Sequence, residues 1–461
     1  MHLLAIGGSD AGIAAALRAR ELDDAHEITV MLADEFPNFS VCGLPYLVSG
    51  EVADWRDLAH RRREEIEALG IRVVTGATAR AIDVAGHRVR ATGPEGSEWA
   101  TPYDRLVIAT GATPVRPTIA GLERLGAADG VHALHTMDDA FAVLATLSER
   151  RPERAVVIGA GYIGLEMAEA LTHRGLAVSL VEALPQVLSS LDPALADVVA
   201  ATLVAHGVEV RTATTVREVA RVGDELVVRT TSADGDNVEI RAGLVLVVTG
   251  VTPDVALARA AGATLGARGA IQVDRRMATG LPDIYAAGDC VITHHALLGE
   301  TYLPLGTTAH KQGRIAGENA LGGDRHFAGS LGTQVVRVFE TVAARTGIRD
   351  HEARDAGLNP RTAVVSVDDH KAYYPGATRI AVRLTGDDTN GRLLGVQLVG
   401  TVASAVHKRV DTVAAALFSG LGVDELGDLD LAYTPPLGSP WDALQVAAQR
   451  WRAEAPTRVD R

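Results

Sequence analysis

The chain is poor in cysteine and has no excess of basic charge. It contains two cysteines, Cys42 and Cys290, among 461 residues, which excludes a disulfide-dense scaffold and is typical of a reducing compartment. The formal net charge of −14 argues against nucleic acid as a partner, because a phosphate polymer binds a basic face. We therefore expect a protein of the cytoplasm that binds no nucleic acid.

Long apolar runs are also missing. The run at residues 243–248 is far shorter than the roughly 20 residues that a membrane-spanning helix requires. The first residues lead into a short apolar strand, with neither a basic segment nor a cleavage site of the kind that marks a signal peptide. The sequence thus predicts no signal peptide and no membrane partner.

One supersecondary plan occurs twice, in a chain long enough for about three domains of roughly 150 residues. A strand at 3–6, a glycine turn, a helix at 11–22 and a strand at 27–32 form the first copy. The second copy has a strand at 155–158, a turn at 159–164 and a helix at 165–174. The alternation predicts an α/β fold with two nucleotide sites.

The second turn is a complete GxGxxG motif, with Gly159 at the sharp bend and Gly161 where a pyrophosphate approaches the backbone. Glu182 follows about 20 residues later, where a carboxylate accepts the ribose hydroxyls and repels a 2′-phosphate, so NADH is expected in preference to NADPH. The predicted NADH residues are Gly159, Gly161, Tyr162, Ile163, Glu182 and Gly250.

The first turn is less regular, because Ser9 replaces the middle glycine. Asp34 lies two residues beyond the expected end of the second strand and is either a ribose ligand or a plain surface acid. Asp289 follows an apolar strand at 283–287 and either holds a ribityl hydroxyl or only forms the turn.

Six segments resemble the single-cysteine pyridine nucleotide-disulfide oxidoreductases, the group of CoA-disulfide reductase, NADH oxidase, NADH peroxidase and persulfide reductase. They are SVCGLPY at 40–46, 159–166, AAGDC at 286–290, TTAHKQGR at 307–314, YYPG at 373–376 and LAYTPP at 431–436. The resemblance covers the whole chain. It implies a homodimer with FAD and NADH as cofactors.

The resemblance also implies two Rossmann-like domains and an α+β C-terminal dimerisation domain. The expected parts are FAD-binding 1–115 and 253–325, NADH-binding 116–252 and dimerisation 326–461. The implied FAD residues are Gly7, Ser9, Ala11, Gly12, Asp34, Ser40, Thr110, Gly111, Gly288, Asp289, Gly306, Thr307 and Thr308. Tyr433 and Tyr374, or less favourably Tyr373, match tyrosines that relatives bring to the partner's cysteine; packing at the interface is the alternative.

Cys42 is the expected redox centre. Tyr46 and Leu47 stand four and five residues later, where two-cysteine relatives carry the second sulfur, so no internal disulfide can form. The thiol would cycle between a thiolate and a sulfenic acid or mixed disulfide, and a helix beginning after it should favour ionisation. An inert buried thiol is the alternative for Cys42, and a structural role is expected for Cys290.

Asp10 departs from the family pattern, in which oxidases and peroxidases carry His and CoA-disulfide reductases a small residue. A carboxylate there could move a proton for a departing thiol but would repel the thiolate; alternatively it caps the helix that follows. Recognition of CoA stays open, because Glu21 stands where relatives often have a further Arg beside Arg18 and Arg20.

The leading hypothesis is an FAD-dependent enzyme that uses NADH and Cys42 to reduce a small disulfide or persulfide, with a small thiol as product. Two alternatives remain: an NADH oxidase or peroxidase acting on oxygen or hydrogen peroxide, and a non-enzymatic redox sensor.

Overall fold

The computed structural model describes residues 1–454 and divides into two compact units. The first unit comprises Met1–Arg116, Leu134–Ala142 and Gly250–Ser330. The second comprises Pro117–Ala133, Val143–Thr249 and the chain from Leu331 onward. The second unit therefore holds most of the predicted NADH-binding part together with the chain from Leu331, whereas Leu134–Ala142 belongs to the first unit.

A parallel five-stranded sheet forms the centre of the first unit. Its order is β18 (Ile284–Ala286), β7 (Arg105–Ile108), β1 (His2–Ile6), β2 (Glu27–Met31) and β3 (Ile71–Val74). Leu3, Leu4 and Leu106 are fully buried, as expected for strands covered on both faces. The remaining strands are β4 (Thr78–Asp83), β5 (Arg88–Thr92), β6 (Glu98–Pro102), β8 (Ala112–Pro114), β17 (Val251–Pro253), β19 (Thr293–His295) and β20 (Gly299–Thr301).

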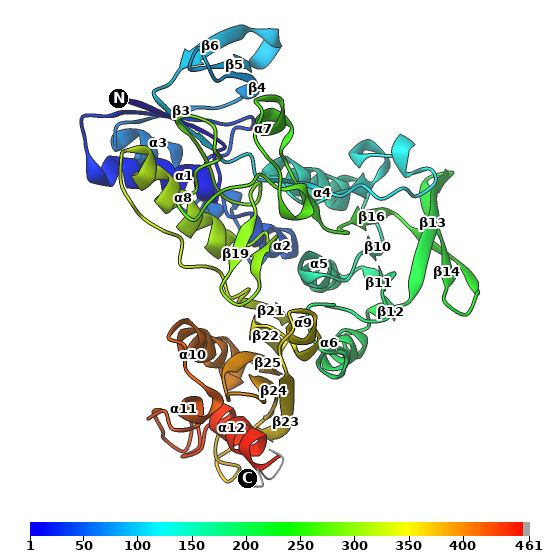
Figure 1. Cartoon of the computed structure of the whole chain (residues 1–461). Helices are drawn as coiled ribbons and strands as arrows, with labels where there is room; N and C mark the ends of the chain where they lie inside the picture. Colours follow the sequence, from blue (N-terminus) through cyan, green and yellow to red (C-terminus); the bar gives the residue numbers. More distant parts are fainter. Residues whose placement is uncertain (455–461) are drawn as a thin grey trace. The chain divides into compact units, whose positions relative to one another are not determined.

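Helices α1 (Asp10–Leu22) and α8 (Gly306–Ala320) lie side by side in this unit (Figure 1). A Cβ added at Gly313 would stand 2.2 Å from the backbone oxygen of Ala11, so the two helices touch backbone to backbone there. The shorter helices are α2 (Leu44–Ser49), α3 (Arg63–Ala68) and α7 (Ala256–Ala260). Helix α4 (Met137–Glu149) runs on from the first unit into the second.

The second unit contains the other parallel sheet. Its order is β12 (Glu209–Arg211), β11 (Ala177–Val181), β10 (Arg154–Ile158), β16 (Leu244–Val247) and β9 (Val131–His132). It is accompanied by α5 (Tyr162–His173), α6 (Pro193–Ala205) and an antiparallel sheet of β13 (Thr214–Val222), β14 (Glu225–Ser232) and β15 (Asn237–Ala242). Helix α5 begins three residues earlier than predicted, because Gly161 takes the cap position and the turn passes directly into the helix.

An antiparallel sheet follows towards the C-terminus. Its order is β21 (Gln334–Val338), β22 (Thr341–Gly347), β25 (Leu393–Thr401), β24 (Arg379–Asp387) and β23 (Pro360–Asp368). Helix α10 (Val406–Phe418) packs on β22 and β25, and α12 (Ala443–Ala453) on β23 and β24 (Figure 1). Two short helices, α9 (Asp350–Asp355) and α11 (Val423–Gly427), complete this part. The predicted α/β class with an α+β C-terminal part is confirmed.

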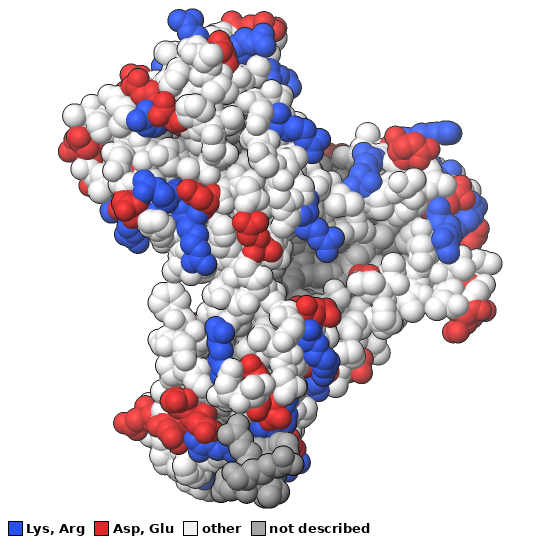
Figure 2. All heavy atoms as spheres, viewed as in Figure 1, with Lys and Arg blue, Asp and Glu red and all other residues white. Residues whose placement is uncertain are grey.

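On the face shown in Figure 2, acidic and basic side chains are interspersed among neutral ones. No helix within residues 1–454 is long and apolar enough to cross a membrane.

Candidate active site

The first glycine turn is packed directly against the sheet. Gly7 has φ +117°, and a Cβ there would stand 1.9 Å from the backbone oxygen of Ala109. A Cβ at Gly12 would come equally close to the backbone oxygen of Gly7. Ser9 occupies the cap position of α1, and its side chain makes no capping hydrogen bond. Asp10 is the first residue of the helix, one residue earlier than predicted, so the expectation that Asp10 is the cap residue is wrong.

The turns after β7 and β18 lie at the same edge of this sheet, because the carboxyl ends of adjacent parallel strands coincide. Thr110 donates its hydroxyl to the backbone oxygen of Asp254 at 2.6 Å, and Gly111 has φ +72°. The backbone N–H of Gly288 donates to Oε1 of Gln312 at 3.0 Å, which joins this turn to α8. The edge therefore has a fixed backbone on which a ligand can lie.

Asp289 is half-buried at this edge. Its carboxylate forms no hydrogen bond or ion pair with residues 1–454, whereas its backbone oxygen accepts a hydrogen bond from the Tyr302 hydroxyl at 2.9 Å. Burial, together with the negative charge of Asp10, raises the pKa of Asp289 to about 6. A carboxylate left without a partner in such a place fits a hydroxyl-bearing ligand such as a ribityl chain.

Two further predicted FAD residues lie on the segment that follows β2. Asp34 is exposed, and its Oδ1 accepts the backbone N–H of Phe36 at 2.9 Å in a local turn. The N–H of Ser40 donates to the backbone oxygen of Leu58 at 2.8 Å, and its side chain makes no cap bond. This turn uses only one of the two carboxylate oxygens of Asp34, so the other could accept a hydrogen bond from a ribose hydroxyl. Ribose binding by Asp34 stays a prediction.

The two cysteines have contrasting surroundings. Cys42 is exposed, in a single turn of 3₁₀ helix (Val41–Gly43), and α2 begins at Leu44, which confirms the helix predicted after the thiol. The Asn38 N–H donates to the backbone oxygen of Gly8 at 2.7 Å, so this segment is attached to the glycine turn. Cys290 is fully buried, and burial raises the pKa of its thiol to about 11, as expected for a structural residue.

The starts of α1 and α8 meet at Asp10. A Cβ at Gly306, the first residue of α8, would stand 3.0 Å from Oδ2 of Asp10. Thr307 and Thr308 follow in the first turn of α8, and the Thr308 hydroxyl donates to Oγ of Ser330 at 3.3 Å. The Gly306 contact places the start of α8 next to the first residue of α1.

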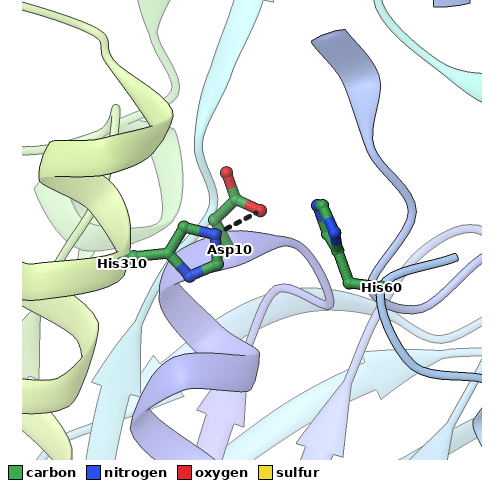
Figure 3. Close-up of side chains that lie close together, drawn as sticks. All are labelled: Asp10, His60 and His310. Carbon is green, nitrogen blue, oxygen red and sulfur yellow. Dashed lines mark ion pairs between the residues drawn. The ribbon is translucent and has the colours of Figure 1, made fainter. Parts of the chain in front are cut away.

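Two histidines face Asp10. Nε2 of His310, on α8, lies 3.3 Å from Oδ1 of Asp10, and His60 approaches from the loop after residue 58 (Figure 3). One ligand atom from each of the three residues lies within 4.8 Å of the others. Sequence reasoning assigned neither histidine a role. His310 stood inside a recognised segment, but nothing in the chain order indicated that it or His60 would meet Asp10.

The nucleotide turn of the second unit has the geometry that GxGxxG requires. Gly159 has φ +107°, and a Cβ there would stand 2.6 Å from the backbone oxygen of Val248. A Cβ at Gly164 would stand 1.9 Å from the backbone oxygen of Gly159. A Cβ at Gly161 would meet nothing within 4 Å, so the approach to the backbone is open there.

Glu182 is held at this turn by both carboxylate oxygens. Oε2 accepts the N–H of Ala160 at 2.7 Å, and Oε1 accepts the N–H of Leu184 at 2.9 Å. A carboxylate held in this way after β11 has the geometry to accept hydrogen bonds from ribose hydroxyls.

Three other predicted NADH residues have different settings. Tyr162 begins α5, and its hydroxyl donates to Oε1 of Gln334 at 2.6 Å and lies 3.1 Å from Oγ of Ser190. Burial raises its pKa. Ile163 is half-buried beside it, and Gly250 belongs to the first unit, with φ +112°.

The loops that carry the predicted tyrosines meet within the second unit. The N–H of Lys371 donates to the backbone oxygen of Pro435 at 3.3 Å. Tyr374 and Tyr433 are each 43% exposed, and Tyr373 is 74% exposed. Partial burial raises the pKa of Tyr433, and a hydrogen bond with Tyr373 raises it further. Since Cys42 belongs to the first unit, a role for these tyrosines at the cysteine stays a prediction.

Comparison with known proteins identifies the family. Two family models match, pyridine nucleotide-disulphide oxidoreductase over residues 1–313 and the dimerisation domain of the same family over residues 333–443. The chain belongs to the pyridine nucleotide-disulphide oxidoreductase family. It is therefore an oxidoreductase and a flavoprotein, with FAD and a nicotinamide nucleotide as cofactors, which confirms those predictions.

Relatives within the family carry different names. An NAD(P)H coenzyme A polysulfide/persulfide reductase of Pyrococcus horikoshii is 34% identical, over 96% of this chain and 97% of the relative. An NADH oxidase of Methanocaldococcus jannaschii is 32% identical, over 97% of this chain and 98% of the relative. The structure of an NAD-dependent persulfide reductase from A. fulgidus is 38% identical, with a TM-score of 0.91, over 97% of this chain and 82% of that one.

Proposed function

We propose that this flavoprotein uses NADH to reduce a small disulfide or persulfide, with Cys42 as its redox centre. One observation carries the proposal. Of the two cysteines, only Cys42 is exposed, and its segment is hydrogen-bonded to Gly8 of the first glycine turn, whereas Cys290 is buried with a raised pKa. A sulfur nucleophile must reach its substrate as a thiolate, and only Cys42 has that access.

The proposed reaction consumes one NADH and one proton and converts a disulfide into two thiols. Sγ of Cys42 attacks one substrate sulfur, so that a Cys42–substrate S–S bond forms, the original S–S bond breaks and a thiolate departs. FAD, when bound, supplies the path for the electron pair of NADH to reach this sulfur. Cleavage of the mixed disulfide by that pair regenerates the Cys42 thiolate and releases the second product. With a persulfide, one of the two products is hydrogen sulfide.

The edge of the first parallel sheet at which β1, β7 and β18 end, here called the FAD edge, has the features that this cofactor needs. The N–H groups at the start of α1 provide a site for a pyrophosphate, and the Asp289 carboxylate, which has no partner among residues 1–454, provides an acceptor for a ribityl hydroxyl. The remaining proposed residues are Gly7, Ser9, Ala11, Gly12, Asp34, Ser40, Thr110, Gly111, Gly288, Gly306, Thr307 and Thr308.

NADH is proposed to bind at the turn of the second unit. The open space at Gly161 supports approach of a pyrophosphate, and the fixed carboxylate of Glu182 supports a preference for NADH over NADPH. Tyr162, whose hydroxyl is hydrogen-bonded to Gln334, would have to move aside to admit the nicotinamide ring, and its neighbour Ile163 is proposed as a contact. Gly250 is proposed as a further contact.

Asp10 is proposed to handle the proton of the departing thiol. The contact between its Oδ1 and Nε2 of His310 supports this role. A carboxylate alone carries no proton to donate at neutral pH, but one in contact with an imidazole can relay a proton from that ring to the departing thiolate. A proton shared between this carboxylate and the imidazole would also reduce the repulsion between Asp10 and a thiolate.

A homodimer is proposed to complete the site, with Tyr374 and Tyr433 reaching the cysteine of the partner subunit. The match to a dimerisation-domain model supports the dimer, as do exposed apolar side chains in the same part of the chain. Those exposed by more than half are Val364, Tyr373, Val402, Phe418, Leu437 and Trp441.

An NADH oxidase or peroxidase is the second candidate, favoured by the M. jannaschii relative that bears the name NADH oxidase. It differs from the first in its electron acceptor. A redox sensor, the third candidate, would oxidise NADH very slowly with every acceptor.

The deciding experiment is an anaerobic NADH titration of the wild type, Cys42→Ser and Cys290→Ser. We expect the wild type to consume NADH only after a disulfide or persulfide is added, and Cys42→Ser to lose at least about two orders of magnitude in turnover, because the nucleophile is gone. Cys290→Ser serves as the matched control and should retain turnover. Rapid consumption with oxygen alone would favour the oxidase, and full disulfide turnover by Cys42→Ser would exclude the proposed role of this thiol.

A further inference from the structure

Asp10, His60 and His310 form a cluster that the reaction above does not fully use. They come from three separate elements, namely the first residue of α1, the loop after residue 58 and the second turn of α8 (Figure 3). His60 and His310 are exposed, and the carboxylate of Asp10 lies between their rings. The set of two imidazoles and one carboxylate is a ligand set that divalent transition metals prefer.

The distances fit metal coordination. Metal–ligand distances of about 2.0 to 2.1 Å in a tetrahedral zinc site place neighbouring ligand atoms about 3.3 Å apart. Nε2 of His310 and Oδ1 of Asp10 lie 3.3 Å apart, and the ligand atoms of all three residues lie within 4.8 Å of one another. Because His60 is exposed, its side chain can rotate to close the remaining gap without disturbing the core.

A simple ion pair accounts less well for the cluster. A partly exposed pair between Asp10 and a protonated His310 would contribute little to stability, because solvent screens both charges. A second protonated ring, that of His60, would then repel the first, whereas two neutral imidazoles can share one cation. A further carboxylate, Asp289, lies within electrostatic range of Asp10 and adds to the negative charge that a cation would offset. The positive helix termini at Asp10 and Gly306 oppose a cation, so the site should bind reversibly and not hold a permanent structural metal.

We propose that Asp10, His60 and His310 form a reversible binding site for a divalent transition metal ion such as Zn²⁺. Three protein ligands leave a fourth position open to water or to a soft ligand such as a thiol. If Asp10 also handles a proton in the proposed reaction, a bound ion would compete for the same oxygen and slow turnover. That consequence rests on the proposed function, but the binding does not.

The test is metal binding to the purified, FAD-loaded protein, measured by Co²⁺ absorption and by calorimetric titration with Zn²⁺. We expect one ion per chain in the wild type. His60→Ala and His310→Ala should each weaken binding by at least about tenfold, since loss of a direct ligand costs no less than loss of an outer-shell partner. Tetrahedral Co²⁺ bands should disappear in both variants. This readout does not use turnover, so it can fail or succeed independently of the proposed reductase reaction.

His26→Ala is the matched control. Nε2 of His26 lies 3.5 Å from Oδ2 of Asp23 in the same unit, and no third metal-ligating side chain joins this pair within residues 1–454. Its removal should leave binding unchanged. Equal affinity in the wild type and both cluster variants, or absence of binding by the wild type, would overturn the proposal. Flavin absorbance and thermal unfolding verify that each variant is folded, and His60, on an exposed loop, provides a variant that keeps the core intact.

Discussion

At the scale of single residues, the two thiols differ in access and in acidity. Cys42 is exposed beside the start of a short helix, whereas Cys290 is fully buried, with Sγ 3.4 Å from the backbone oxygen of Ala287. Alkylation requires a thiolate that the reagent can reach. Burial raises the pKa of Cys290 to about 11, so this thiol is protected from alkylation both by its inaccessibility and by its low fraction of thiolate.

Thiol labelling of the reduced native protein should therefore modify one cysteine. We expect iodoacetamide at mildly alkaline pH to add one group to the wild type and to Cys290→Ser, and none to Cys42→Ser, as measured by intact mass spectrometry. Unfolding in denaturant should restore labelling of Cys290. Rapid labelling of Cys290 in the native protein would contradict the burial seen here.

Glu352 is a second residue whose surroundings fix its charge. Burial opposes its ionisation, but hydrogen bonds from Arg349 and Arg345 outweigh burial and lower its pKa to about 2. Oε1 accepts from Nη2 of Arg349 and Oε2 from Nη2 of Arg345, each at 2.8 Å. A carboxyl whose pKa is lower in the folded than in the unfolded chain stabilises the fold above its unfolded pKa.

Glu352→Gln should thus lower the free energy of unfolding by up to about 2 to 3 kcal/mol at pH 7. The deficit should shrink as the pH falls below about 4.5 towards 2, where the wild-type carboxyl also becomes neutral. Urea unfolding of both proteins across this pH range measures it. Glu225→Gln, which removes an exposed ion pair with Arg241, is the control and should cost no more than about 1 kcal/mol. A deficit that persists undiminished at low pH would show that charge is not its cause.

At the scale of elements, the packing of α1 against α8 depends on two glycines of α8. A Cβ at Gly313 or Gly317 would stand 2.2 Å from a backbone oxygen of α1, that of Ala11 or Ala15. Backbone atoms cannot rotate away as a side chain can, so a methyl group must push the helices apart. The separation would reach the FAD edge, because both helices begin there.

Gly317→Ala should destabilise the protein by about 1 to 3 kcal/mol through overpacking. The sign of this stability change is informative, because replacing Gly by Ala inside a helix ordinarily stabilises a protein by about 1 kcal/mol. Differential scanning calorimetry measures the change. Gly126→Ala is the control: a Cβ there meets nothing within 4 Å, and its φ is −149°. Stabilisation by Gly317→Ala would mean that the helices are not in backbone contact.

The starts of the secondary-structure elements could be predicted from the sequence, but the contacts between distant elements could not. The strand–turn–helix starts at Gly7 and Gly159 follow from local pattern, because a glycine turn and apolar periodicity act over short stretches of chain. The ends of α1 and α5 differ from prediction by one to three residues, since hydrogen bonding and not side-chain pattern sets where a helix starts. The meeting of His60 and His310 with Asp10 had no local signal.

At the scale of the whole molecule, the C-terminal part exposes large apolar side chains that no other part of residues 1–454 covers. Leu437 is 79% exposed and Phe418 70% exposed. Exposed apolar groups of this size, gathered in a part that matches a dimerisation-domain model, support association of two copies.

Leu437→Glu should weaken the proposed dimer and, with it, turnover, because the adjoining loop carries Tyr433. Sedimentation velocity over a range of protein concentrations measures the first effect, and steady-state kinetics the second. Val204→Glu is the matched control, since Val204 is 59% exposed on α6, outside the dimerisation-domain match. A wild type that stays monomeric, or a Leu437→Glu variant with unchanged association, would contradict the proposed interface.

The sequence by itself determined the fold class, the two nucleotide turns and the family, because these depend on residue types at fixed short spacings: glycines at 159, 161 and 164, a single cysteine at 42 and an acid at 182. Only the tertiary structure decided which distant residues share a place. Three features depend on how separate segments pack: the contrast in exposure between Cys42 and Cys290, the Asp289 carboxylate without a partner in residues 1–454, and the approach of two histidines to Asp10. Packing brings together side chains hundreds of residues apart, and chain order carries no direct record of that proximity.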